Sequence, residues 1–161
     1  MSKLTHEQYK EQFCNWKSRT QENSIYWYQC TAQVKHYCKL VRGYTVGRFW
    51  GTAIRWRVNR KSTFQFKKSI SWFSLVPVWS VVIFKQYAIV ETKKPWTDEW
   101  KKTKLGVEGH VAIVDYIDND GVIRVIEQNG ATGDGDGKGG DEIRVRGYRG
   151  KKAVCGFILE K

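Results

Sequence analysis

The chain has 161 residues, enough for one domain with its own core. Hydrophobic residues make up 41% of it, which argues against a disordered chain. Lysine and arginine number 28 against 16 aspartate and glutamate residues. The resulting net charge of +12 favours a polyanionic partner: nucleic acid, an acidic membrane surface or an anionic wall polymer.

Targeting and cysteine patterns narrow the class of protein further. The four cysteines show neither a CxxC pair nor metal-ligand spacing. The opening MSKLTHEQYKEQFCNWK has no apolar run, which predicts no signal peptide, and no stretch is long enough for a transmembrane helix. We therefore expect a protein made in the cytoplasm that acts elsewhere only after release or delivery, without a cofactor.

Residues 1–24 form a polar lead with a short predicted helix. Thr5 is the expected N-cap, and Gln8 would complete a capping box. No chemistry is expected in this lead. Three apolar side chains are expected to pack on the body of the protein: Leu4, Tyr9 and Phe13.

The segment SIYWYQCTAQVKHYCKLVR, residues 24–42, holds the first candidate functional residue. From residue 31 onward apolar residues recur at helical spacing, which predicts a helix with one buried face and Gly43 as its C-cap. Cys30 falls at the start, where unpaired N–H groups and the helix dipole favour a thiolate. It is a nucleophile only if a base accompanies it, and is otherwise a core residue. Cys38, on the apolar stripe, is expected in the core.

Residues 31–90, here called the basic stretch, contain eleven lysine or arginine residues and no acidic residue. Within them, aromatic and basic side chains interleave over residues 44–75. Such a pattern can bind nucleic acid, line a groove for sugar rings, or simply pack. A short helix is expected near residues 51–58. Residues 76–90 predict a buried strand after a proline-marked turn, and residues 91–106 a polar surface loop.

The segment GHVAIVDYIDNDGVIRVIEQN, residues 109–129, predicts a β-hairpin with its turn at Asp118-Asn119-Asp120-Gly121. If residue 118 pairs with residue 121, His110 lies opposite Asn129, and Glu127 is its diagonal neighbour on the same face. These three side chains can orient a general base, although they can also be a satisfied polar group. His110 is the candidate base for Cys30.

The other two histidines are poorer partners for this cysteine. His6 lies in the polar lead, and His36 points away from Cys30 around the helix. After the hairpin, a glycine-rich loop over residues 130–142 contains three aspartates: Asp134, Asp136 and Asp141. They miss the EF-hand pattern, so a flexible loop near the active site is favoured over a metal site. Two strand-like runs, IRVRGY and KAVCGFIL, follow.

Taken in order, QC at 29–30, GHVAIV at 109–114 and EQN at 127–129 resemble the CHAP family of cysteine- and histidine-dependent amidohydrolase/peptidases, over residues 25–161. The resemblance implies a papain-like α+β fold, with N-terminal helices packed on a central antiparallel sheet. It also implies site residues. Cys30 would be the nucleophile, His110 the base, Glu127 its orienting partner and Asn129 a positioning residue, while Gln29, Gly109 and the Cys30 N–H would bind the oxyanion or substrate.

The family cleaves amide bonds of bacterial peptidoglycan, either between muramic acid and L-alanine or in the stem peptide and cross-bridge. The resemblance thus implies a phage endolysin or a tail-associated lysin, with the basic stretch binding anionic wall polymers. The alternatives are a delivered antibacterial amidase toxin or, from another class, a nucleic-acid-binding module. Two departures stand out. Trp79-Ser80 replaces the Gly-Asp of many members, and NSIYWYQ before Cys30 lacks the acidic residues of calcium-binding members.

Overall fold

An antiparallel sheet is the main element of the computed structural model, which describes residues 3–15, 18, 20, 29–46, 64–68, 76–93, 97–129 and 142–160. The helices are α1 (His6–Phe13) and α2 (Cys30–Tyr37), which continues as a π-helical turn (Cys38–Arg42). The strands are β1 (Phe64–Lys67), β2 (Val81–Phe84), β3 (Ile89–Lys93), β4 (Lys101–Lys104), β5 (His110–Ile117), β6 (Ile123–Glu127), β7 (Arg144–Arg149) and β8 (Val154–Glu160).

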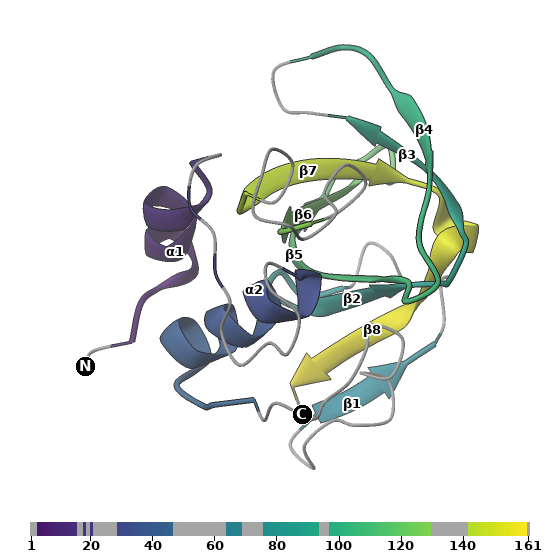
Figure 1. Cartoon of the computed structure of the whole chain (residues 1–161). Coiled ribbons are helices and arrows are strands. Elements are labelled where there is room, and N and C mark those ends of the chain that lie inside the picture. Colours follow the sequence, from purple (N-terminus) through teal and green to yellow (C-terminus); the bar gives the residue numbers. More distant parts are fainter. Residues whose placement is uncertain are drawn as a thin grey trace.

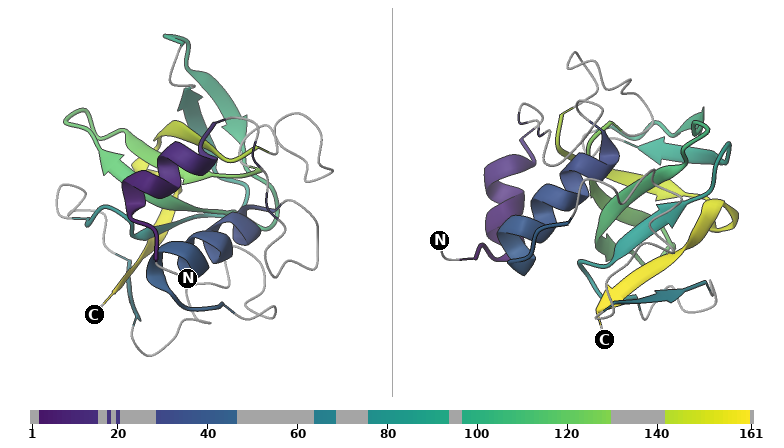
Figure 2. Two further views of the ribbon diagram at one scale, coloured as in Figure 1. Left: turned by 90° about the vertical axis from the view of Figure 1, so that its left-hand side faces the viewer. Right: turned by 60° about the horizontal axis from the view of Figure 1, so that its bottom comes forward.

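Among the described residues, eight strands form one sheet in the order β1-β8-β2-β5-β6-β7-β3-β4 (Figure 1). Both helices lie on one side of it, and α2 is the nearer to the strands (Figure 2). The helix α2 contacts β5 and β6, whereas α1 contacts the π-helical turn. The predicted α+β class, with N-terminal helices against an antiparallel sheet, is confirmed.

The helix α1 begins with the predicted capping box. The backbone N–H of Gln8 donates to Oγ1 of Thr5 at 3.1 Å, and the Thr5 N–H donates to Oε1 of Gln8 at 2.8 Å. Tyr9 is fully buried in the same core cluster as Cys30, so α1 belongs to the body that carries α2. His6 is also buried, and its Nε2 lies 3.0 Å from Oδ1 of Asp115.

The predicted helix after residue 30 is present and ends as expected. Gly43 terminates it in the left-handed conformation, with φ of 74°. Cys38 is buried, as predicted, and its sulfur accepts a hydrogen bond from the Tyr44 hydroxyl at 3.3 Å. The last turn is π-helical rather than α-helical, which the apolar spacing did not indicate.

In the β5–β6 hairpin, the strand residues predicted to face each other do so. The turn and the strand register each differ from the prediction by one residue, and the two differences compensate. Ile113 pairs with Ile126, the register expected from the sequence. The turn itself is different, because the Asp118 N–H donates to the carbonyl of Val122, not of Gly121. A register shift at Asp115 compensates for the longer turn. The assumed pairing of residues 118 and 121 is therefore wrong. At the other end of the hairpin, near His110, the side chains still lie on the predicted face of the sheet.

Three other expectations need correction or lie outside the described residues. Residues 76–90 are not one strand, because the chain turns after Phe84 and β3 begins at Ile89. The expected loop 91–106 contains the end of β3 and all of β4. The strand β4 is an exposed, lysine-rich sheet edge, and such edges lack the hydrophobic alternation that marks a strand. The helix expected near residues 51–58 lies outside the described residues.

Candidate active site

Cys30 is the first residue of α2, as the sequence predicted, and Gln29 is its N-cap. The side chain is largely buried, with 8% of its surface exposed. The first N–H groups of a helix have no acceptor within it, so the N–H of Cys30 points to the space before the helix. The dipole of α2 is positive at this end and favours an anion at the sulfur.

His110, the first residue of β5, is brought together with both of its predicted partners. Its Nε2 donates to Oε2 of Glu127 at 2.8 Å, and the Cys30 side chain is near enough to raise the pKa of the imidazole. The imidazole is 2% exposed and packs beside the rings of Phe84 and Tyr148, each with its centroid 5.9 Å away. These two rings also contact each other, with centroids 4.9 Å apart.

The environment of His110 favours the imidazolium form. Burial acts to lower the pKa of His110, but hydrogen bonds to Cys30 and Glu127 outweigh it and raise the pKa to about 9. At neutral pH the site therefore holds a proton on the imidazole. An imidazole beside a cysteine is the arrangement in which a base serves a sulfur nucleophile.

Glu127 is a fully buried carboxylate surrounded by donors. Besides His110, its Oε2 accepts a hydrogen bond of 2.5 Å from the Tyr148 hydroxyl. Its Oε1 lies 3.2 Å from Nε of Arg144 and 3.1 Å from Nε of Arg146. Burial acts to raise the pKa of Glu127, but the His110 hydrogen bond and the nearby positive charges hold it far below its usual range. The carboxylate stays ionised.

The sequence analysis missed the three side chains of β7 that surround Glu127. Arg144, Arg146 and Tyr148 alternate along the strand, so they share one face, and Arg144 pairs with Glu127 across the sheet. The signal was present in IRVRGY. Two arginines occupy alternate positions of this run, and each is next to a buried residue. Arginines that alternate with apolar residues in a central strand indicate a buried anion nearby.

Asn129 contacts Gln29 in this structure. Its side-chain amide donates to Oε1 of Gln29 at 3.1 Å. The expected contact was with the imidazole or with substrate, and no interaction of Asn129 with His110 occurs among those described. The contact anchors the Gln29 carboxamide beside Cys30. With Oε1 so occupied, Nε2 is the end of Gln29 that can donate to a bound oxygen.

Gln128, between two predicted site residues, was also missed. It is fully buried, accepts from the Thr20 N–H at 2.7 Å, and donates to the Thr20 carbonyl at 2.8 Å and the Gln29 carbonyl at 3.4 Å. The run EQN thus contacts His110, the backbone before α2, and the side chain of Gln29. No local pattern in the sequence distinguished Gln128 from an ordinary strand-end residue.

Gly109 has a clear backbone role, and its expected oxyanion or substrate role stays a prediction. Its φ of 68° is left-handed, and a Cβ here would lie 2.5 Å from the carbonyl oxygen of Phe84. Its N–H donates to the Gly106 carbonyl at 3.1 Å. Glycine at this position lets β5 start against β2 and thereby places His110.

Other predicted ligand sites are only partly within the described chain. Among the described residues, no three His, Cys, Asp or Glu side chains are placed to hold a metal, and no helix is long and apolar enough to cross a membrane. Asp134, Asp136 and Asp141 lie outside those residues. Much of the basic stretch also lies outside the described residues. In the part that is described, Lys35 is buried.

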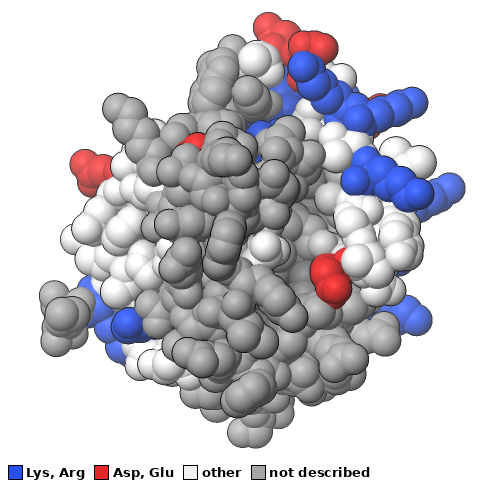
Figure 3. Space-filling model, viewed as in Figure 1, with Lys and Arg blue, Asp and Glu red and all other residues white. Residues whose placement is uncertain are grey.

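A basic surface that the sequence analysis did not predict lies at the sheet edge. Figure 3 shows lysine and arginine side chains gathered where the β3–β4 hairpin lies. Three β4 lysines contribute, of which Lys101 and Lys102 are exposed on neighbouring positions and Lys104 is exposed near the end of the strand. The sequence predicts a loop over residues 91–106, and a loop gives these charges no defined surface.

Comparison with known proteins adds no assignment. No family model matches the chain, and no curated protein matches it. The chemistry of the site is therefore inferred from its own residues: a thiol at a helix N-terminus, an imidazole whose pKa the neighbouring thiol helps to raise, and a buried carboxylate hydrogen bonded to the imidazole.

Proposed function

We propose that this chain is a cysteine amidohydrolase or peptidase of the CHAP type, with a papain-like fold, that cleaves amide bonds of bacterial peptidoglycan. The observation that carries the proposal is the buried pair of His110 and Glu127, with Cys30 at the start of α2 near enough to raise the pKa of the imidazole. The motifs QC, GHVAIV and EQN support the same assignment by their order along the chain.

In the proposed reaction, the Cys30 thiolate attacks the carbonyl carbon of the amide. His110 gives its proton to the nitrogen, the C–N bond breaks, and the amine leaves while the acyl group remains on sulfur as a thioester. The neutral imidazole then takes a proton from water. The resulting hydroxide attacks the thioester, the C–S bond breaks, and the carboxylic acid leaves with the thiolate restored.

The oxyanion of each tetrahedral intermediate needs donors close to Cys30. We assign this role to the backbone N–H of Cys30 and Nε2 of Gln29, because Gln29 is the N-cap of the helix that Cys30 opens. Asn129 holds the other end of the Gln29 carboxamide, and Gln128 holds the Gln29 carbonyl, so both fix this donor before substrate binds. Such preorganisation avoids a reorientation cost in the transition state.

Glu127 positions the imidazole and stabilises its charge without taking its proton. Arg144 and Arg146 favour the ionised carboxylate, so the proton of His110 stays on nitrogen and is available for the leaving amine. The role parallels that of the buried carboxylate in serine-histidine-aspartate triads. Glu127 is therefore a positioning residue rather than a group that contacts substrate.

Peptidoglycan contains two classes of amide bond that fit the proposed reaction. They are the muramoyl–L-alanine amide and the peptide bonds of the stem or cross-bridge. A phage endolysin, a tail-associated lysin and a delivered antibacterial toxin would share this chemistry. The basic stretch, together with exposed lysines of β4, would attract anionic wall polymers. A nucleic-acid-binding module would use these charges as well, but it assigns no role to Cys30 beside His110.

The test is clearing of a peptidoglycan-containing gel or suspension by the purified chain and two matched variants. We expect the wild type and Cys14→Ser to clear it and Cys30→Ser to leave it intact, because Cys14 lies just after α1 and has no described interaction with His110. Circular dichroism would show that both variants are folded. Clearing by folded Cys30→Ser would exclude the proposed nucleophile.

A further inference from the structure

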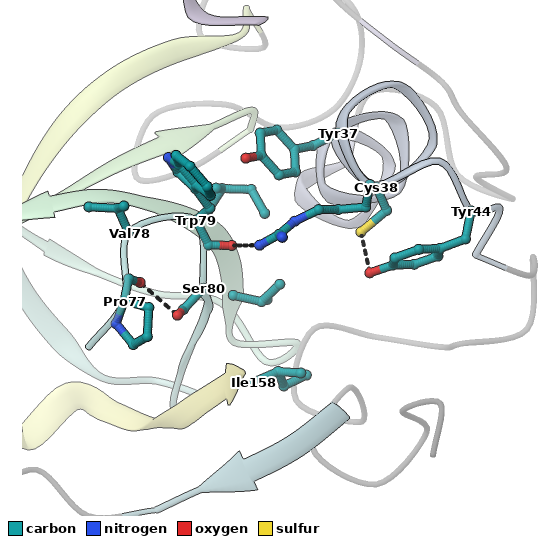
Figure 4. Close-up of a pocket in the computed structure, with 11 residues that line it drawn as sticks. Tyr37, Cys38, Tyr44, Pro77, Val78, Trp79, Ser80 and Ile158 are labelled. Carbon is teal, nitrogen blue, oxygen red and sulfur yellow. Dashed lines mark hydrogen bonds between the residues drawn. The ribbon is translucent and has the colours of Figure 1, made fainter. Parts of the chain in front are cut away.

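A pocket of about 330 Å³ lies at the opposite end of α2 from Cys30 (Figure 4). Its walls are the π-helical turn with Tyr44 on one side and the turn Pro77–Ser80 on the other, and its floor is formed by β2, β5 and β8. Neither Cys30, His110 nor Glu127 lines it. A site here would be distinct from the proposed reaction centre.

Trp79 lines this pocket from a backbone conformation that favours glycine. The Ser80 N–H donates to the Pro77 carbonyl, which makes Trp79 the third residue of a tight turn, and its φ is 75°. A bulky residue adopts this conformation only at an energetic cost. Trp79 stays 39% exposed, and its ring packs on one side against the buried His6, with ring centroids 5.3 Å apart. Strain of this kind is concentrated at ligand-binding sites.

Arg42 places a guanidinium group beside the indole. Its Cζ lies 5.8 Å from the centre of the Trp79 ring, and its Nη2 donates to the Trp79 carbonyl at 3.4 Å. Arg42 is the one charged residue among the described residues that line the pocket. It is carried by the π-helical turn, a rare conformation that is frequent at functional sites. The pocket is thus complementary to an anion.

The rest of the pocket lining determines which uncharged part of a ligand fits. The floor is apolar, formed by Val81, Ile113 and Ile158. Two wall hydroxyls donate within the protein, that of Tyr44 to the Cys38 sulfur at 3.3 Å and that of Ser80 to the Pro77 carbonyl at 2.7 Å. A sugar would bring several hydroxyls that need partners on this apolar floor, whereas an apolar ring needs none.

We propose that the pocket binds a small organic anion that combines an apolar ring with a carboxylate. The ring lies against the Trp79 indole and the aliphatic floor, and the carboxylate pairs with the Arg42 guanidinium, which matches carboxylate geometry. Binding here does not depend on the thiol of Cys30, so the Cys30→Ser variant binds the same ligand. This separates the pocket from the proposed hydrolase activity.

The test is a titration of the whole chain with indole-3-acetate and, as the matched neutral probe, indole-3-acetamide. The readout is the indole N–H resonance of Trp79 in nitrogen-15 NMR spectra, assigned with Trp79→Phe. We expect a saturable shift with the acetate and at least tenfold weaker binding of the acetamide. Arg42→Gln should remove the preference for the acetate. An absent saturable shift, or equal affinity for both probes in the wild type, would overturn the proposal.

A second pair of variants separates binding from folding. Trp79→Gly suits the left-handed turn and removes the indole, so we expect an unchanged or higher melting temperature and at least tenfold weaker indole-3-acetate binding by calorimetry. Tyr87→Gly is the control, because Tyr87 is also exposed and left-handed, with φ of 54°, but does not line the pocket. Full binding by Trp79→Gly would contradict the assignment, as would an equal loss in Tyr87→Gly.

Discussion

His110 and Glu127 form a buried pair in which Nε2 of the imidazole lies 2.8 Å from Oε2 of the carboxylate, with 2% and 0% of the residues exposed. Neither group has water to solvate its charge, so each depends on the other. The second carboxylate oxygen is held by Arg144 and Arg146. The charge balance of the site therefore extends from the thiol of Cys30 to β7.

Replacing Glu127 by glutamine should damage both activity and stability. The carboxamide keeps the shape but leaves two buried arginines without their anion, which costs about 3–5 kcal/mol of unfolding free energy. Loss of the imidazolium partner should lower kcat about 10²–10⁴-fold. Urea unfolding and muropeptide turnover, measured where the variant is folded, check both effects.

Glu142→Gln is the matched control for this change. It removes the same charge from the other side of Arg144, where Oε2 of Glu142 lies 3.8 Å from Nη1, and makes no contact with His110 among the described interactions. We expect near wild-type kcat for it. An equal loss in both variants would show that the general charge of the region, rather than the contact with His110, matters.

The raised pKa of His110 predicts how stability depends on pH. The pKa is about 9 in the folded chain against 6.5 unfolded, so the folded state binds the proton more tightly. The resulting stabilisation, about 3 kcal/mol at most, is fully present below pH 6.5 and is lost as pH rises through about 9. Unfolding free energies from pH 6 to 10, taken relative to His110→Gln, should show this decline.

Activity should share the alkaline limit, because the imidazolium that protonates the leaving amine disappears above about pH 9. A soluble muropeptide substrate gives the pH profile of activity without interference from wall binding.

The stability series has a contradicting outcome of its own. If the wild type and His110→Gln lost stability in parallel from pH 6 to 10, His110 would not carry the raised pKa.

The contact between Asn129 and Gln29 predicts a shared effect on the transition state. Gln29→Ala should lower kcat about 10–10³-fold, because it removes an oxyanion donor. Asn129→Ala should lower kcat less, and the double variant should resemble Gln29→Ala, because both substitutions disable the same donor. Steady-state kinetics of the three variants tests this. A shifted alkaline limit in Asn129→Ala would instead indicate contact with the imidazole.

The exposed lysines of β4 should contribute to wall binding. Salt shortens the screening length from about 10 Å at 0.1 M to about 3 Å at 1 M, so pelleting with whole walls should weaken while muropeptide turnover changes little. The variant Lys101→Gln with Lys102→Gln and Lys104→Gln should pellet less, as should Arg57→Gln with Lys61→Gln and Lys67→Gln from the basic stretch. Salt-insensitive pelleting of all three proteins would assign these charges to solvent alone.

What the sequence predicted was mainly local in origin. Helical spacing placed Cys30 at a helix start, and strand alternation placed His110 and Glu127 on one face, because both periodicities act over a few residues. The bulge at Asp115 was not predictable, yet it preserved that face by offsetting a longer turn. The fold class came instead from the resemblance to the CHAP family, which depends on the order of motifs along the whole chain.

What the sequence did not predict depends on distant pairings. Arg144 and Arg146 face Glu127 only because β7 pairs with β6. No local pattern in the sequence sets the register of that pairing. His6 meets Asp115 across 109 positions of the chain, so a histidine of a polar lead becomes buried. Trp79 adopts a glycine conformation that side-chain type alone argues against.

The central claim is that Cys30, activated by His110, cleaves an amide of peptidoglycan. The most direct measurement is mass spectrometry of purified peptidoglycan after incubation with the wild type or with folded Cys30→Ser. The account predicts wild-type fragments with one new amino group and one new carboxyl group at a single class of amide bond, and none with Cys30→Ser. Unchanged peptidoglycan after wild-type treatment, or the same fragments from Cys30→Ser, would contradict it.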